Sequence, residues 1–238
     1  NKIEKIIQDT NIHGFHFVDE AAPPKMLRAL SEELLKRDLK ITWWTNIRFE
    51  KTFDRELCQL MAKSGCIAVT GGLEVASDRL LEKMKKGVDI AQVTQVTHQF
   101  SEQGILVHAY LMYGFPSETE QETIDSLEVV RQLFEKNCIQ SAFWHQFTTT
   151  VHSPIGQNPQ DFGIQITGPV FEGFAQNDLL HDDPLGADHP KYTQGLNRAL
   201  DGYLNRVGFE KELQNWFDFP VPPTRHSETL IEDFLSVV

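Results

Sequence analysis

The sequence has few cysteines, no long apolar run and a shortage of positive charge, and each of these excludes a class of protein. Three cysteines, Cys58, Cys66 and Cys138, cannot form a closed set of disulfides, which favours a reducing, cytoplasmic location. No apolar stretch approaches the roughly 20 residues that span a bilayer, since even the run 105–115 is interrupted by His108. The 22 Lys and Arg against 34 Asp and Glu give a net charge of −12, which argues against binding to a nucleic-acid backbone or an anionic membrane.

What remains is the composition of an ordinary globular chain. Charged residues make up 24% and hydrophobic residues 40% of the 238 positions, enough for a sizeable core in one domain or in a domain with an appendage. The first ten residues form a charged helical segment rather than a signal peptide. Because the sequence begins at Asn1 and not at Met, we expect it to be a fragment of a longer protein.

Short apolar runs alternate with helical patterns through the first part of the chain. The runs are rich in aromatic and β-branched residues and mostly continuous, which is typical of strands buried on both faces of a parallel sheet. They cover residues 12–18, 41–45, 66–70, 105–112 and 139–147. The helices between them have recognisable starts. These starts are Pro24 at a first helical position, the caps Asp54, Ser77 and Asp89, and the capping box of Thr119 with Glu122.

This alternation predicts βα units with parallel strands and right-handed crossovers. We expect a partial TIM-type (β/α) barrel over residues 1–153, with a doubly wound open sheet as the alternative. A helix over 3–8 precedes the first strand, so we expect the first βα unit of the barrel to be missing. Residues 154–238 are rich in Pro, Gly and Asp and predict a mostly helical and irregular C-terminal extension packed on the barrel. Its expected helices cover 193–206, the region near 209–216, and 228–237.

Charged and polar residues follow each apolar run, where the carboxyl ends of parallel strands meet at one rim. Carboxylates can receive an ammonium group or a ribose diol, and an arginine can hold a carboxylate, so the set suits a zwitterionic, hydroxyl-bearing ligand. Taken singly, each residue also has an ordinary structural explanation, such as a turn cap for Asp19, a surface ion pair for Arg48 or helix support for Glu74. The full set is Asp19, Glu20, Asn46, Arg48, the segment 71–74, the segment 113–118, His145, Gln146 and the segment 148–150.

Two long phrases, GGLEVASDRLLEKMKKGVD and GILVHAYLMYGFPSETEQET, resemble the radical S-adenosylmethionine superfamily. The phrases FHFVDEA, WWTNIRFEKTFDRELCQLMAKSGC and FWHQFTTTVHSPIG support the likeness, which covers roughly residues 3–155. The chain is most similar to the subgroup of iron–sulfur oxidoreductases whose members often carry an N-terminal cobalamin-binding domain. The resemblance implies a partial barrel that binds S-adenosylmethionine and a [4Fe–4S] cluster, with cobalamin as an open question.

The cluster-binding pattern of that family, Cys-x-x-x-Cys-x-x-Cys, does not occur in this sequence. Its three cysteines are scattered, and we expect them to be buried as small hydrophobic side chains. The resemblance therefore implies that the longer protein is an enzyme, which reductively cleaves S-adenosylmethionine to a 5′-deoxyadenosyl radical that takes hydrogen from a substrate. The fragment itself is expected to be inactive, to hold no metal and to contact its own missing N-terminal domain. The expected substrate is a small molecule, with neither a nucleic acid nor a membrane as partner.

Carried over by matched position, the resemblance implies roles for the residues at the rim. Asp19 and Glu20 match the segment that meets the methionyl amine, although many members have Gly-Gly-Glu where this chain has Asp19-Glu20-Ala21. Arg48 is implied to hold the methionyl carboxylate, and Glu74 with Ser77 matches the segment at the ribose or methionyl group. The turn near the adenine is implied to consist of Tyr113, Gly114, Phe115 and Pro116, completed by Gln146. The resemblance assigns no catalytic residue.

Two other functions stay open at this stage. A metal-dependent barrel hydrolase or lyase is suggested by nine histidines and by the run from His181 to His189, although His13 and His16 would face opposite sides of a strand. A non-enzymatic binding module would need an exposed apolar patch, for which Trp216, Phe217 and Phe219 are the candidates. We expect these three rings to cover the lower or open side of the barrel instead.

Overall fold

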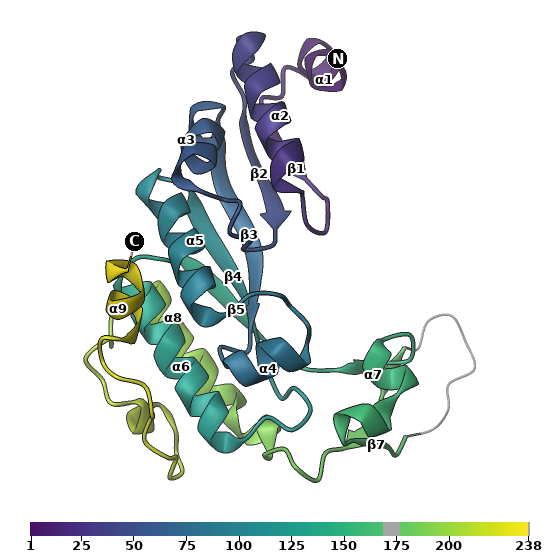
Figure 1. The fold of residues 1–238 in the computed structure, drawn as a ribbon, viewed down its shortest axis with the longest axis vertical. Helices are drawn as coiled ribbons and strands as arrows, with labels where there is room; N and C mark the ends of the chain where they lie inside the picture. Colours follow the sequence, from purple (N-terminus) through teal and green to yellow (C-terminus); the bar gives the residue numbers. More distant parts are fainter. Residues whose placement is uncertain (169–176, 238) are drawn as a thin grey trace.

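The computed structural model describes residues 1–168 and 177–237, and a sheet of five parallel strands runs through it (Figure 1). The strands lie side by side in the order in which they occur in the chain. A doubly wound sheet would need this order to reverse at one point, so the partial-barrel prediction is confirmed. The strands are β1 (Gly14–Phe17), β2 (Thr42–Ile47), β3 (Cys66–Glu74), β4 (Leu106–Tyr113) and β5 (Ser141–Gln146).

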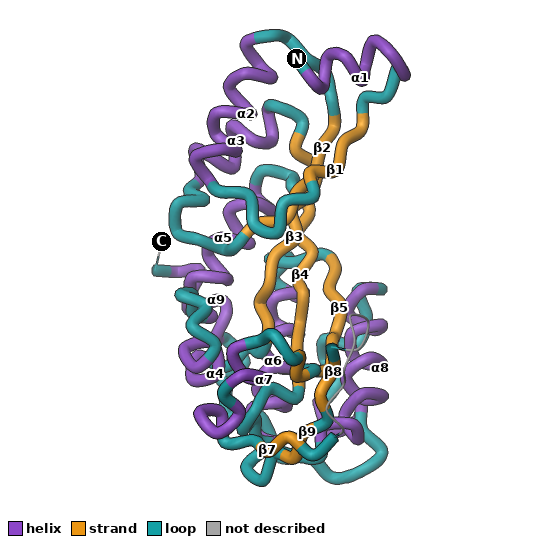
Figure 2. Tube along the Cα trace, turned by 90° about the vertical axis from the view of Figure 1, so that its right-hand side faces the viewer, coloured by secondary structure: helices purple, strands orange, loops and turns teal. Residues whose placement is uncertain are grey.

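The helices that connect the strands begin where the sequence predicts. Asp54, Ser77 and Asp89 each accept a hydrogen bond from a backbone N–H in the first turn of their helix, and Thr119 forms the capping box with Glu122. The helices are α1 (Lys2–Thr10), α2 (Pro24–Lys36), α3 (Arg55–Lys63), α4 (Asp78–Lys83), α5 (Ile90–Glu102) and α6 (Glu120–Glu135). Figure 2 shows α2, α3 and α5 on the same side of the sheet.

Only the helix-facing side of the sheet is fully buried. Val69 and Leu111 point into the core, whereas Trp44, Tyr110 and Phe143 on the opposite side are 42%, 44% and 54% exposed. The prediction that both faces of the strands are buried is therefore wrong for this chain. The reason is that α2, α3, α5 and α6 all pack against the same face, which leaves the other face, called the open face below, accessible.

The C-terminal extension contains few long elements. Two-stranded ribbons join β6 (Thr149–Thr150) to β8 (Asp178–Leu179) and β7 (Gln165–Ile166) to β9 (His181–Asp182). The helices are α7 (Pro154–Gln157), α8 (Thr193–Leu204) and α9 (Leu230–Ser236), with 3-10 turns at Pro159–Phe162, His189–Tyr192 and Leu213–Trp216. The helix predicted near 209–216 is wrong in extent, because only this last turn forms there. The proposed boundary between residues 153 and 154 falls at the N-cap of α7.

Helix α8 packs beside β5 and α6, and its buried Leu196 and Tyr203 join the core of the sheet. The candidate patch residues Trp216, Phe217 and Phe219 pack here, with Phe217 only 7% exposed and Trp216 against the ring of Tyr203. They therefore cover α8, and the prediction that they lie over the lower or open side of the barrel is wrong. Among the described residues, no helix has the length and apolar character needed to cross a membrane.

Candidate functional site

The carboxyl ends of β3 and β4 bring two of the predicted site segments together. The strands are neighbours, with Glu74 in register with Leu111, so Glu74 and Gly114 lie at the same end of the sheet. At the next pair, Tyr113 is in register with Gln146. This edge is where barrels of parallel strands bind their ligands, because the loops that follow all strands converge there.

Glu74 is the last residue of β3, which extends four residues beyond its predicted end. A bulge between Gly72 and Glu74 and a φ of 60° at Glu74 turn its side chain back over the strand. A Cβ placed on Gly72 would lie 2.2 Å from Oε1 of Glu74, so only glycine leaves room for this carboxylate. Because Leu73 points into the core, the carboxylate over Gly72 lies on the open face.

Lys86 holds this carboxylate. Its Nζ lies 2.6 Å from Oε1 of Glu74, and the Glu74 side chain is only 14% exposed. Lys86 also lines a cavity of about 490 Å³ together with Arg48, Lys51 and Gln92. The lining holds three cations against one carboxylate, that of Glu50, and this excess of positive charge suits an anionic group such as a carboxylate. Lys86, a residue to which the sequence analysis gave no role, therefore pairs with Glu74 and shares a cavity with Arg48.

Ser77 forms hydrogen bonds with residues of both α4 and α6. Its hydroxyl accepts a hydrogen bond from Leu80 N at the start of α4 and donates to Oε1 of Glu122 on α6, over 3.0 Å. Arg79 binds the same carboxylate with Nη2 at 2.6 Å. Burial alone would raise the pKa of Glu122, but the hydrogen bonds from Arg79, Thr119 and Ser77 outweigh it and lower the pKa to about 2. Ser77 thus already has a structural role in fastening α4 to α6.

The turn after β4 is held by Glu118. Its Oε2 accepts hydrogen bonds from the backbone N–H groups of Gly114 at 2.7 Å and Phe115 at 3.1 Å, and its Oε1 accepts one from Thr123. Glu118 is fully buried, and this burial raises the pKa of its carboxyl group to about 7. Gly114 has a φ of 85°, a conformation that suits glycine. Sequence analysis placed Glu118 at the rim without a role, and its signal is an acidic residue four positions after the turn glycine.

The side chains of the turn after β4 mostly contact other parts of the protein. The hydroxyl of Tyr113 pairs with Oγ1 of Thr193 over 2.8 Å, and Phe115 is buried against Phe147. The carbonyl of Pro116 accepts a hydrogen bond from Lys83. The turn therefore presents a rigid backbone to a ligand. The exposed Asp19 and Glu20 follow the outer strand β1, and the exposed Gln146 ends β5 at the other side.

Residues of the segment 181–189, which suggested a metal site, are used by this turn. Oδ2 of Asp183 accepts a hydrogen bond from Ser117 N at 2.6 Å, and the ring of His189 packs on Gly114, 3.3 Å from where a Cβ would lie. Among residues 1–168 and 177–237, no three His, Cys, Asp or Glu side chains gather as metal ligands would. The segment therefore offers no observation in favour of the hydrolase alternative.

The three cysteines are buried and unpaired, as predicted. Burial raises the pKa of each thiol, Cys58, Cys66 and Cys138, to about 12. A cluster ligand must be a thiolate, whereas burial in the apolar core keeps these thiols neutral. They do not fit the role of cluster ligands.

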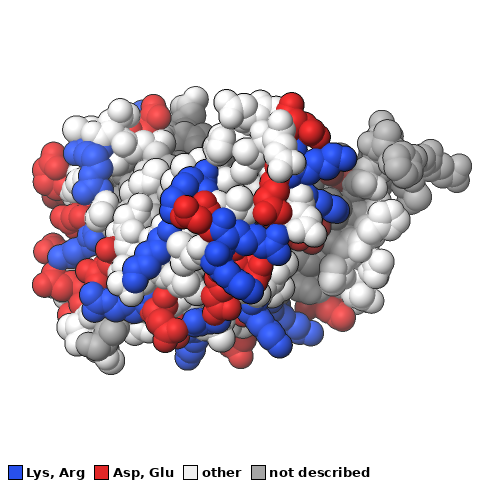
Figure 3. Space-filling model, turned by 90° about the horizontal axis from the view of Figure 1, so that it is seen from above, with Lys and Arg blue, Asp and Glu red and all other residues white. Residues whose placement is uncertain are grey.

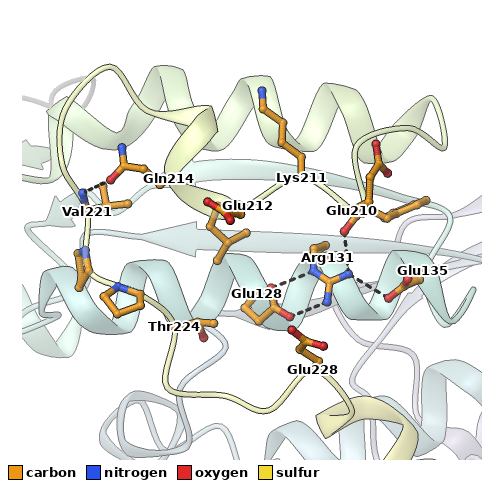
Figure 4. A pocket seen from close by; sticks show the side chains of 14 residues that line it. Glu128, Arg131, Glu135, Glu210, Lys211, Glu212, Gln214, Val221, Thr224 and Glu228 are labelled. Atoms are coloured by element: carbon orange, nitrogen blue, oxygen red, sulfur yellow. Dashed lines mark hydrogen bonds and ion pairs between the residues drawn. The ribbon is translucent and has the colours of Figure 1, made fainter.

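A larger cavity of about 750 Å³ lies between α6 and the segment 209–228 (Figure 4). The guanidinium of Arg131, which lines this cavity, is bonded to Glu128 at 2.6 Å, to Glu135 at 3.0 Å and to the carbonyl of Phe209 at 3.0 Å. The hydrogen bonds from Arg131 to Glu128 raise the pKa of the guanidinium further above its ordinary value. This cation is therefore already satisfied, and none of the lining residues comes from a strand end.

Comparisons with known proteins show the family and the fold of the chain. The profile of the Radical SAM superfamily matches residues 2–130. The chain is 28% identical over 134 residues to the anaerobic magnesium-protoporphyrin IX monomethyl ester cyclase of Rubrivivax gelatinosus, covering 55% of this chain and 24% of the relative. It is 30% identical over 135 residues to the tRNA-2-methylthio-N(6)-dimethylallyladenosine synthase of Mycobacterium ulcerans, covering 52% of this chain and 25% of that relative. The chain thus spans about a quarter of the length of these relatives.

One solved structure shares the fold over most of the chain. The radical S-adenosylmethionine methyltransferase TsrM from Kitasatospora setae, solved with cobalamin and a [4Fe–4S] cluster bound, superposes with a TM-score of 0.60 at 18% identity. The superposition covers 84% of this chain and 44% of TsrM. It shows that the five-stranded sheet and its helices have the architecture of that enzyme's barrel.

Proposed function

Because the chain belongs to the radical SAM superfamily, we propose that it binds S-adenosylmethionine at the carboxyl edge of its sheet, as part of a longer enzyme that reductively cleaves this cofactor to a 5′-deoxyadenosyl radical. The relatives include a cyclase and a methylthio-transferring synthase. The reaction that we propose is therefore limited to cofactor cleavage, the step that members of the superfamily share, and the reaction on the substrate is left open.

The observation that carries the proposal is the carboxylate of Glu74, fixed over Gly72 and bonded to Lys86. A fixed carboxylate can accept hydrogen bonds from both hydroxyls of a ribose without first losing side-chain entropy. Beside it, the cavity lined by Arg48 and Lys86 offers cations to the methionyl carboxylate. The ribose hydroxyls and the methionyl carboxylate of one nucleoside thus have complementary partners on neighbouring strand ends.

The remaining predicted residues complete the proposed site. Asp19 and Glu20, exposed after β1, are proposed to receive the methionyl ammonium. The turn at Gly114, held rigid by Glu118, is proposed to border the adenine, with Gln146 on the adjoining strand. A rigid turn contributes to affinity because no loop has to be ordered when the base binds.

The [4Fe–4S] cluster, when bound in the longer protein, supplies the electron for the cleavage. Since the three cysteines of this chain do not fit as cluster ligands, we propose that this chain alone holds the nucleoside but does not cleave it. Its contribution is to orient the cofactor and to exclude water around it.

We also propose a small-molecule substrate. The net charge of −12 disfavours the phosphate contacts on which nucleic-acid binding depends. On the face seen from above in Figure 3, Lys and Arg side chains are interspersed with Asp and Glu rather than segregated from them. Contacts with the preceding domain of the longer protein are proposed for the chain as well.

The proposal is tested by titrating this chain with S-adenosylhomocysteine, followed by calorimetry. Glu74→Gln keeps the shape of the side chain but removes its charge, so we expect the affinity to fall about tenfold or more, the loss typical of a charge-assisted hydrogen bond. Glu82→Gln, at an exposed position on α4, is the matched control and should bind like the wild type. In the longer protein, Glu74→Ala should abolish cleavage of S-adenosylmethionine while its cluster stays intact. Equal affinity for all three chains would remove Glu74 from the site.

A further inference from the structure

The open face of the sheet carries a group of aromatic and imidazole rings on β4 and β5. Tyr110 lies 5.6 Å from His145, His145 lies 4.6 Å from Phe143, and His108 lies 5.2 Å from Tyr110, measured between ring centroids. We call these four residues the ring cluster. Phe143 and Tyr110 are about half exposed, although each ring could bury a large apolar area.

The ring cluster adjoins the carboxylate of Glu74. Tyr110 is in register with Gly72 on β3 and with Phe143 on β5, so these three residues form one line across the open face. The Glu74 carboxylate lies over Gly72. Since neighbouring strands are about 4.8 Å apart, this carboxylate and the ring of Tyr110 occupy adjacent positions on the face.

The open face at β4 and β5 carries no Lys, Arg, Asp or Glu side chain. Nδ1 of His108 lies 2.5 Å from Oγ of Ser141, and burial together with nearby His145 lowers the pKa of His108, so this imidazole is neutral at pH 7. The surface is therefore aromatic and without fixed charge, with its rings tilted to one another by 53° to 85°, and its neighbour is an anion. The complementary ligand is a planar ring without charge on its face, because such a ring stacks on aromatic side chains without the desolvation cost of an ion.

We propose that the ring cluster receives a planar aromatic or conjugated ring of the small-molecule substrate, stacked on Tyr110 and Phe143. This inference rests on the proposed function, because it places the ring beside the nucleoside that Glu74 holds. It adds the class of substrate and the residues that select it. A radical formed at that nucleoside would then face a ring or one of its substituents.

The experiment titrates this chain with two flat probes of different size, namely indole and metal-free protoporphyrin IX, and with cyclohexanol as an apolar probe that is not flat. The imidazole proton resonances of His108 and His145 report binding by NMR. We expect at least one flat probe to shift both sets of resonances through ring currents, and cyclohexanol to leave them unchanged. The probe that binds best identifies the size class of the ring. Equal shifts with cyclohexanol, or no shift with any flat probe, would overturn the proposal.

Two variants separate stacking from general apolar binding. Phe143→Ala removes an exposed ring and should weaken binding of the flat probe about tenfold, in the range of base–aromatic stacking. Leu106→Ala removes an exposed aliphatic side chain from the same face of β4 and should bind like the wild type. Tyr110→Phe keeps the ring and should also retain binding. Equal weakening by Phe143→Ala and Leu106→Ala would overturn the assignment.

The same samples distinguish this inference from the proposed function. Phe143→Ala should keep its affinity for S-adenosylhomocysteine, and Glu74→Gln should keep its affinity for the flat probe. Ring binding without nucleoside binding would contradict the proposed function alone, and nucleoside binding without ring binding would contradict this inference alone. Sedimentation of the chain tests another occupant: a dimer that Phe143→Ala dissociates would assign the face to a second copy and overturn the proposal.

Discussion

Nζ of Lys86 and Oε1 of Glu74 lie 2.6 Å apart and join the loop before α5 to the last residue of β3. The two residues are twelve positions apart in the chain, and each faces a different part of the proposed site. Lys86 lines the cavity with Arg48, whereas Glu74 lies on the open face beside Tyr110. The ion pair thus links the proposed sites of the nucleoside and of the substrate ring.

Replacing Lys86 should reduce nucleoside affinity more than stability. In Lys86→Met the stem of the side chain is kept but the cation is lost, so Glu74 loses its partner and the cavity one of its charges. We expect affinity for S-adenosylhomocysteine to fall about five- to tenfold, and the free energy of unfolding to change by about 1 kcal/mol or less, because the Lys86 side chain is 35% exposed and water reaches its end of the pair. Calorimetry and urea denaturation measure the two effects. Lys85→Met, at the exposed neighbouring position, is the control, and a similar affinity for both variants would contradict the role of Lys86.

Gly72→Ala should displace the Glu74 carboxylate while leaving the sheet intact. The new Cβ would lie 2.2 Å from Oε1, the end of a side chain that can rotate away. We expect the loss of nucleoside affinity to match that of Glu74→Gln, about tenfold. Gly14→Ala, on β1, is the matched control because its Cβ would meet nothing closer than 3.6 Å. If Gly72→Ala bound as tightly as Gly14→Ala, the position of the carboxylate would be irrelevant to binding.

The alternation of strands and helices and the first residues of the helices were predictable, because their signals in the sequence are local. Asp54 and Asp89 cap helices that begin at the next residue, and each cap needs only a side chain and the backbone three positions on. The parallel sheet followed from the alternation of apolar runs with those helices. The sequence signals for these features all lie within short stretches of the chain.

The parts that sequence analysis missed depend on distant contacts. The glycines at 71 and 72 were taken to end the third strand, but Gly71 still pairs with Ile47 and the strand continues to Glu74. The Glu74–Lys86 pair requires the bulge that turns the carboxylate, which no periodicity reveals. The continuous apolar run 105–112 does not indicate which face of β4 is covered, since that depends on what packs against it.

Buried Glu118 should make stability fall as the pH rises from about 4.5 to about 7. Its pKa is raised in the folded state, mainly by burial, so over this range the folded chain keeps a proton that the unfolded chain has released. The contribution is fully present below pH 4.5 and is lost by about pH 7, with a total of about 3 kcal/mol. The lowered pKa of Glu122 makes stability rise with pH, but only below about pH 4.5. The pH ranges in which Glu122 and Glu118 change the stability therefore do not overlap.

Urea denaturation at pH 5, 6, 7 and 8 measures this dependence. Glu118→Gln still offers an oxygen to Gly114 N but cannot titrate, so we expect its stability to vary less between pH 5 and 7 than that of the wild type, by up to about 1.4 kcal/mol per pH unit. Glu82→Gln, at an exposed position, should keep the wild-type slope. Parallel curves for wild type and Glu118→Gln would show that Glu118 is ionised throughout.

The three cysteines should be inert in the folded chain. With a thiol pKa of about 12, only about one thiol in 10⁴ is ionised at pH 8, and the thiolate is the reactive form. We expect a chromogenic disulfide reagent to label none of the three in native buffer and all three in urea. Anaerobic incubation with iron and sulfide should accordingly leave this chain colourless, because a cluster needs converging thiolates. A four-iron chromophore in stoichiometric amount, lost on replacing Cys58, Cys66 or Cys138, would show that these residues ligate a cluster after a rearrangement of the fold.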